Sequence, residues 1–229
     1  MKLKSNSDKK LSVSINGSVF LRYPIKTHII SSTDKILAVV KRYADPHVKK
    51  GDVVVISERV IAITQGRSIL IEEINPSWWA RGLYKFVYKH PGGIGLRSPY
   101  TMEMAIQEAG LWRILAAAGV AAVLKPLNIH GVFYHLVGSG VNAIDGPTSY
   151  TLPPGNKSVT LGPKEPQKVA EMLSQELETP VVVIDANDYG VRVIAEHGGV
   201  NKKLMEKIFA DNPMGQAREQ TPIVIVRRK

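Results

Sequence analysis

Residues 181–190 read Val-Val-Val-Ile-Asp-Ala-Asn-Asp-Tyr-Gly. Four consecutive β-branched residues predict a short buried strand. Three oxygen-bearing side chains follow it directly, those of Asp185, Asn187 and Asp188. Ligands of sheet proteins often bind just beyond strand ends, and oxygen donors suit Mg²⁺ or Mn²⁺. The alternative is an Asx turn, in which Asp and Asn side chains bond to their own backbone.

Other apolar runs place this strand in a sheet. Residues 52–57, Asp-Val-Val-Val-Ile-Ser, predict a second buried strand, and residues 223–226 predict a closing strand. Alternation across residues 11–23, around Asn16-Gly17, predicts a strand or hairpin. Elsewhere we expect strands at 68–74 and 131–137, and either a strand or a short helix at 60–63. Helices are expected at about 35–43, 111–124 and 201–209, and further helices are expected to begin at 76, 98 and 165. Residues 138–154 are expected to form a turn-rich loop. Strands and helices interleave without a strict βαβ repeat, which predicts an α+β or mixed α/β fold with mixed sheets flanked by helices.

The composition is that of an ordinary globular protein. The chain has 229 residues and no Cys, which excludes disulfides, thiolate nucleophiles and Cys-bearing zinc sites. Residues 1–10 contain four Lys and no apolar stretch, so we expect a disordered basic arm rather than a secretory signal, and a cytoplasmic protein. Residues 11–229 are expected to form one domain, either as one body or as two intertwined subdomains.

The net charge of +10 lies largely at the two ends of the chain. Residues 227–229, Arg-Arg-Lys, are expected to be a solvated tail. No basic stripe with interleaved aromatic residues is visible, so we expect phosphorylated small molecules rather than nucleic acid as partners. The longest apolar run, residues 114–124, is too short for a membrane span, and no membrane partner is expected.

Two more polar loops resemble the one after residue 184. Residues 142–147, Asn-Ala-Ile-Asp-Gly-Pro, follow the predicted strand at 131–137, and residues 215–222 enter the last strand. Asn142, Asp145 and Glu219 would then join the first cluster around one cation with bound phosphates. The alternative is ordinary surface loops. The sequence contains no P-loop, nucleophile-elbow or HExxH motif, and its six His residues are scattered, so no catalytic residue is assigned.

The chain resembles the coenzyme F420-0:L-glutamate ligase (gamma-glutamyl ligase) family as a divergent member. The resemblance runs from about Arg22 to Arg227, and it depends on the order and spacing of short pieces. These are Gly51-Asp52-Val53-Val54-Val55-Ile56, Val60-Ile61 through Gln65-Gly66-Arg67, Asn75-Pro76-Ser77, Gly140-Val141-Asn142-Ala143-Ile144-Asp145, Leu152-Pro153-Pro154, Val183-Ile184-Asp185 and Met214-Gly215-Gln216 leading to Pro222.

The resemblance implies a homodimeric, GTP-dependent (or ATP-dependent) acid–amino-acid ligase that uses Mg²⁺ or Mn²⁺. The implied reaction phosphorylates a carboxylate, and the amine of L-glutamate then attacks the acyl phosphate to give a gamma-glutamyl amide. The carboxylate would be coenzyme F420-0, a folate or another acid. Such chemistry requires donors that balance developing negative charge and a site that excludes water.

The polar loops and the resemblance together give two sets of candidates. The metal candidates are Asn142, Asp145, Asp185, Asp188 and Glu219. The nucleotide candidates are Arg22, Tyr23, Pro24, Ile25, Glu58, Arg59, Arg67, Gly215, Gln216 and Thr221.

The chain also departs from the family pattern. Asn142 and Asp145 stand where the family has Asp and Asn, and Ala186 replaces a Thr ligand. Ile63 stands where the family has a Lys that contacts the nucleotide. Arg59 or Arg67 would have to supply the positive charge of that Lys. These departures favour the alternative of a non-catalytic, regulatory relative that binds a nucleotide or metabolite. A third alternative is membrane attachment through residues 111–124 and the basic arm.

Overall fold

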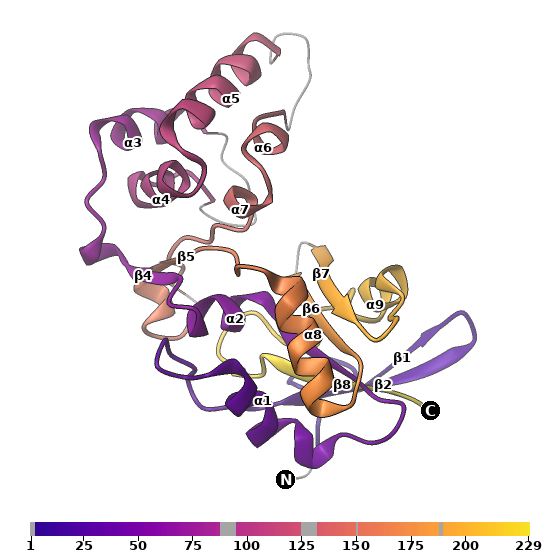
Figure 1. Cartoon of the computed structure of the whole chain (residues 1–229). Coiled ribbons are helices and arrows are strands. Elements are labelled where there is room, and N and C mark those ends of the chain that lie inside the picture. Colours follow the sequence, from indigo (N-terminus) through magenta and orange to yellow (C-terminus); the bar gives the residue numbers. More distant parts are fainter. Residues whose placement is uncertain (1–2, 88–94, 125–131, 150, 188–189) are drawn as a thin grey trace. The chain divides into compact units, whose positions relative to one another are not determined.

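The computed structural model describes the chain except for residues 1–2, 88–94, 125–131, 150 and 188–189. It divides into two compact units (Figure 1). Unit 1 comprises residues 1–66 and 163–229, and unit 2 comprises residues 67–162. Unit 2 is therefore an insertion between two halves of unit 1.

Unit 1 is built on a mixed six-stranded sheet with the order β1-β2-β8-β3-β6-β7. Strands β3 and β6 are parallel, and every other neighbouring pair is antiparallel. The mixed sheet with flanking helices confirms the predicted α+β class. The strands are β1 (Ser12–Ile15), β2 (Ser18–Ile25), β3 (Val53–Ser57), β6 (Val181–Asn187), β7 (Gly190–His197) and β8 (Ile223–Arg228).

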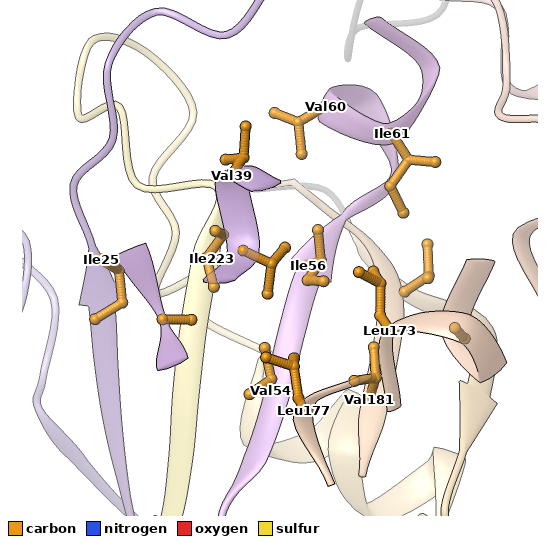
Figure 2. Close-up of a cluster of buried hydrophobic side chains, with 14 of the residues drawn as sticks. Ile25, Val39, Val54, Ile56, Val60, Ile61, Leu173, Leu177, Val181 and Ile223 are labelled. Carbon is orange, nitrogen blue, oxygen red and sulfur yellow. The ribbon is translucent and has the colours of Figure 1, made fainter. Parts of the chain in front are cut away.

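The central strands are apolar on both faces because helices cover both sides of the sheet. On one face, Val54, Ile56 and Val181 pack under α1 (Ile36–Tyr43), α2 (Glu58–Thr64) and α8 (Pro166–Leu177). Figure 2 shows the helix side chains Val39, Val60, Ile61, Leu173 and Leu177 against the strand residues Ile25, Val54, Ile56, Val181 and Ile223. On the other face, the alternate strand residues Val55, Val182 and Val224 pack against α9 (Lys202–Ile208). Residues 60–63 thus belong to a short helix, one of the two predicted options.

The two ends of the chain make more contacts than the sequence predicts. Asn16 and Gly17 have φ values of 49° and 78°, which are the left-handed conformations of a two-residue hairpin turn between β1 and β2. Residues 3–10, for which the sequence predicts a disordered arm, run along unit 1, where the Asn6 side chain bonds to residues 213–221. The expected solvated tail is wrong for Arg227, which is half-buried in β8 and forms an ion pair with Asp52.

Unit 2 is mostly helical. Its helices are α3 (Trp78–Leu83), α4 (Pro99–Ala109), α5 (Leu111–Leu124), α6 (Val132–Val137) and α7 (Ser139–Asn142), and its strands are β4 (Ser68–Leu70) and β5 (Ser158–Thr160). The core gathers Met102 and Ala105 of α4, Ile114 of α5 and Val159 of β5. Short 3₁₀ turns lie at Asp45–His47 in unit 1 and at Ile71–Glu73, Tyr84–Phe86 and Gly155–Lys157 in unit 2.

Two predictions for unit 2 are wrong. The predicted strand at 131–137 is helix α6 from Val132 onward, and the predicted loop at 138–154 begins with helix α7. In the part of the chain that the structure describes, no single helix has the length and apolar character needed to cross a membrane. The helices α4 and α5 meet that test of length and composition only as a pair, and they are bent by 111° at Gly110.

Candidate functional site

Four chain segments of unit 1 end at the same end of its sheet. Because β3 and β6 are parallel, their carboxyl ends coincide, and Ser57 pairs with Ile184. Strand β8 runs in the opposite direction, so its first residue, Ile223, pairs with Ile56 of β3 and with Ile25 at the end of β2. We call this place the carboxyl end of the sheet. Polar side chains just beyond such strand ends are where ligands of α/β sheets usually bind.

Several candidates of unit 1 lie at or next to this carboxyl end. Glu58 and Arg59 are the first two residues of α2, directly after β3. Asp185 is the third residue from the end of β6. Thr221 precedes β8, and the loop before it is joined to β2 because the Thr27 N–H donates to the Gln220 carbonyl at 2.9 Å. The topology therefore brings together candidates that are up to 163 residues apart in the chain, as 58 and 221 are.

Arg22 belongs to the interior rather than to this end. Its side chain is 1% exposed, and it donates to the Ile208 carbonyl at 2.9 Å, to the Lys10 carbonyl at 2.5 Å and to both Asp211 carboxylate oxygens. Burial alone would raise the pKa of Asp211, but the hydrogen bonds and the charge of Arg22 outweigh burial and lower it. Arg22 thus ties β2 to the end of α9 and to the N-terminal arm.

The neighbouring candidates of β2 are also largely covered. Pro24 is buried and Ile25 is fully buried in the core of Figure 2, while Tyr23 is half-buried with the Arg227 guanidinium 5.3 Å from its ring centre. The side chains of these residues are largely covered, so β2 contributes to the carboxyl end mainly through the backbone that follows Ile25.

Asp185 is part of β6, whereas the sequence places it in a loop after the strand. Strand β6 continues to Asn187 because it pairs with β7, and Asp185 lies opposite Arg192. The Asn187 side chain donates to Asp185 at 3.4 Å and accepts from the Gly190 N–H at 3.0 Å. The second bond is the local bonding that the turn alternative predicts. Asp188 lies outside the described residues.

The loop between α9 and β8, residues 211–222, carries Gly215, Gln216 and Glu219. The Glu219 Oε2 accepts from the Ala217 N–H at 2.8 Å, so this carboxylate is folded onto its own loop. A Cβ at Gly215 would lie 2.4 Å from the Glu219 Cδ, and the φ of Gly215 is 78°. The positive φ favours Gly here, and a larger residue would also force the Glu219 side chain to move.

The remaining candidates belong to unit 2. Asn142 ends α7 and is exposed, and Asp145 is exposed and forms a two-bond backbone bridge with Thr160. Because they follow helices α6 and α7, the expectation that they follow a strand is wrong. Their convergence with Asp185 and Glu219 stays a prediction.

Arg67 is engaged within unit 2. Its side chain donates to the Gly162 carbonyl at 2.6 Å and forms an ion pair with Glu108 at 2.8 Å. The guanidinium is about 10% exposed, so a phosphate would have to displace the carboxylate. Of the two arginines suggested as replacements for the missing family Lys, Arg59 is the one in unit 1, in the first turn of α2 after β3.

The few carboxylates predicted as metal ligands in unit 1 fit a metal whose remaining ligands come from the substrate. Among the described residues, no group of three or more His, Asp or Glu side chains is arranged to hold a metal ion. Mg²⁺ is commonly held by one or two carboxylates together with substrate phosphates and water. Asp185 and Glu219 are the predicted carboxylates of this kind in the described part of unit 1, and their joint binding of a metal stays a prediction.

Sequence reasoning missed Asn6 and Asp211. Asn6 donates to three groups of the 213–221 loop, and Asp211 pairs with Arg22. Neither residue stands in a recognisable motif, and each bonds to a residue about 190 to 215 positions away. No local pattern contains that information.

Comparison with known proteins gives one result. The family model described as F420-0:Gamma-glutamyl ligase matches residues 24–196, which is well over half of the chain. No curated protein matches the chain. The matched range includes Glu58, Arg59 and Asp185, whereas Arg22, Tyr23 and the loop at 211–222 lie outside it.

Proposed function

Because the chain belongs to the F420-0:gamma-glutamyl ligase family, we propose that it joins an amino acid to a carboxylate at the expense of GTP or ATP. The observation that carries this proposal is the carboxyl end of the sheet. There Glu58 and Arg59 follow β3, Asp185 lies in the parallel neighbour β6, and the Ser57 N–H donates at 2.9 Å to the carbonyl of Pro222, the last residue of the loop at 211–222, which the family match does not include.

The proposed reaction has two steps. An oxygen of the substrate carboxylate attacks the γ-phosphorus, the bond between that phosphorus and the β–γ bridging oxygen breaks, and GDP or ADP leaves. The amine of L-glutamate then attacks the acyl carbon, inorganic phosphate leaves, and the amine proton passes to solvent or to a basic group. The acceptor is coenzyme F420-0, a folate or another acid.

The residues of the carboxyl end have distinct roles in this proposal. Arg59 supplies positive charge to the phosphates, and residues 215–221 line the nucleotide with backbone groups. Asp185 and Glu219 would hold Mg²⁺ or Mn²⁺, which when bound neutralises phosphate charge and orients the transferred group. The part of Asn142 and Asp145 in unit 2 stays a prediction from sequence, as do the homodimer and the cytoplasmic location.

One observation favours the alternative of a non-catalytic relative. Ile63, which stands where the family has a nucleotide-contacting Lys, packs against the apolar core beneath α2. The Arg67 side chain is paired with Glu108. If Arg59 does not replace the missing cation, nucleotide binding without turnover is the expected behaviour.

The test is a coupled measurement of products. The protein is incubated with Mg²⁺ or Mn²⁺, GTP or ATP, L-glutamate and candidate carboxylates labelled with heavy oxygen. Formation of the glutamyl product by mass spectrometry, with one heavy oxygen in the released phosphate, supports the acyl-phosphate route. Nucleotide binding without any product supports the regulatory alternative. Absence of both binding and product would refute the proposed function.

A further inference from the structure

We propose that residues 3–10, here called the arm, fix the shape of the loop at 211–222 and thereby set the affinity of the site for nucleotide. The second part rests on the proposed function, whereas the first concerns the unliganded protein. The loop connects α9 to β8 without regular secondary structure. Its conformation therefore depends on side-chain bonds rather than on a ladder of backbone bonds.

The loop is held in unfavourable backbone conformations. Asn212 and Gln220 have φ values of 47° and 58°, and Gly215 has 78°. Left-handed conformations of non-glycine residues persist only where the surrounding contacts determine them. Gly215 adopts its φ at no steric cost, so contacts that favour the left-handed conformation matter at Asn212 and Gln220, near the two ends of the loop.

Asn6 provides such contacts from a single side chain. Its Nδ2 donates to the Pro213 carbonyl at 2.9 Å, to the Met214 carbonyl at 3.1 Å and to the Thr221 hydroxyl at 2.7 Å. The Thr221 hydroxyl in turn donates to the Met214 carbonyl at 2.6 Å. This small network closes the loop by joining its beginning to its end.

The arm itself is anchored near the carboxyl end of α9 and to β2. Lys9 donates to the Asp211 carbonyl at 2.7 Å, and the buried Arg22 donates to the Lys10 carbonyl at 2.5 Å and to the Asp211 carboxylate. Asn6 is half-buried, whereas Lys4, Ser5, Ser7 and Asp8 are exposed. Among residues 4–8, the buried contact with the loop is concentrated at Asn6.

The consequence concerns a ligand at the carboxyl end. Only Pro222 separates Thr221 from β8, and the Gln220 carbonyl accepts the N–H of Thr27 beyond β2, so the shape of the loop determines where its backbone groups point. If nucleotide binds there, a loop that is already ordered loses less conformational entropy on binding. Asn6 is in this sense a positioning residue that touches no substrate.

The experiment compares matched variants of the full chain. Asn6→Asp keeps the size of the side chain but removes both donors, and Asn6→Gln restores the amide one methylene further out. Asn201→Ala removes the N-cap of α9, where the Asn201 side chain accepts the Leu204 N–H at 3.0 Å, and it controls for a comparable loss of stability away from the loop.

Two readouts are taken. Hydrogen exchange of the unliganded protein should rise in peptides covering 211–222 for Asn6→Asp, and it should not rise there for Asn201→Ala. Titration with a fluorescent guanine nucleotide and Mg²⁺ should give a Kd raised roughly fivefold to tenfold for Asn6→Asp, which corresponds to the net value of one of the hydrogen bonds that this variant removes, partial recovery for Asn6→Gln and no change for Asn201→Ala.

Each outcome decides one part. Unchanged exchange in the loop of Asn6→Asp would overturn the proposed role of the arm. Faster exchange with an unchanged Kd would overturn its effect on the site. If the unsubstituted protein binds neither GTP nor ATP, the proposed function and the effect on affinity fail together, and the exchange data alone decide whether the arm shapes the loop.

Discussion

Replacing Arg227 with Met should destabilise unit 1, because it would break an ion pair that is buried on one side. Arg227 donates from Nε and Nη2 to the two Asp52 carboxylate oxygens, each at 2.7 Å, and from Nη2 to the His47 carbonyl at 3.2 Å. Asp52 is 1% exposed, while the Arg227 side chain is 22% exposed. The pair ties β8 to the turn before β3.

The magnitude follows from what remains after the substitution. Without Arg227, the buried Asp52 carboxylate keeps the Lys49 N–H at 2.8 Å as its other hydrogen bond described in the structure. Breaking one partner of a buried ion pair costs about 3–5 kcal/mol, and partial access of water through the Arg227 side places this case near 3 kcal/mol. With an m value of about 2 kcal/mol/M, the urea midpoint should fall by roughly 1.5 M.

The assay is urea unfolding followed by far-UV circular dichroism. All three Trp residues (78, 79 and 112) lie in unit 2, so their fluorescence does not report directly on the strands of unit 1. Arg228→Met is the matched control, because Arg228 is the adjacent residue, is exposed and makes one exposed bond to the Ser18 hydroxyl. Its effect should stay within about 0.5 kcal/mol. Equal midpoints for the two variants would refute this reasoning.

Three further predictions concern the site, acid stability and a glycine. Asp185→Asn should abolish metal-dependent nucleotide binding in calorimetry while leaving the circular dichroism spectrum unchanged, and retained binding would remove Asp185 from the metal site. Burial would raise the pKa of Glu103, but hydrogen bonds from the Ser77 hydroxyl and N–H outweigh it and lower the pKa below its ordinary value of 4.5. The ionised Glu103 carboxylate therefore stabilises the folded state above about pH 4.5, and this stabilisation is lost as the pH falls through the folded-state pKa. Ser77→Ala should move acid unfolding to higher pH, and an unmoved transition would contradict this. Gly198→Ala should cost about 1–3 kcal/mol in urea unfolding, because φ is 97° and the new Cβ would lie 2.8 Å from the Pro180 Cβ, and a midpoint equal to that of the unsubstituted protein would show that Pro180 moves freely.

The core of unit 1 could be predicted because its central strands are buried on both faces. Residues 53–56, 181–184 and 223–226 are continuous β-branched runs, and such runs are typical of strands covered by helices on both sides. The turn at Asn16-Gly17 was equally recoverable, since this pair tolerates the left-handed conformations that a tight hairpin requires.

The parts that could not be predicted depend on tertiary context. Strand β7 is a sheet-edge strand of mixed composition, Gly-Val-Arg-Val-Ile-Ala-Glu-His, whose pairing with β6 is not encoded in a local apolar run. Residues 132–137 are rich in β-branched and aromatic side chains, which favour a strand, yet they form α6. Contacts with α5 and α7 outweigh that local preference.

The site was predictable only in part, for the same physical reason. The apolar run predicts that Asp185 lies near a strand end, which the structure shows, whereas the roles of Asp185, Glu58 and Arg59 in a site stay predictions. The bonds of Asn6 to residues 213–221 could not be found, because they join the two ends of the chain. A sequence pattern locates a strand end, whereas the support of a loop beside it requires coordinates.

The geometry of β8 separates stability from function in unit 1. Its first residue, Ile223, lies at the carboxyl end of the sheet, and Arg227 lies at the opposite end, where Val226 pairs with Val53. A loss of about 3 kcal/mol leaves most molecules folded if the protein has the usual 5–15 kcal/mol of stability. Arg227→Met should therefore lower the urea midpoint without changing the Kd for nucleotide, whereas Asn6→Asp should change the Kd. If both variants changed the Kd alike, nucleotide affinity would follow the stability of the whole unit. That result would refute the inference that the carboxyl end of the sheet is the nucleotide site.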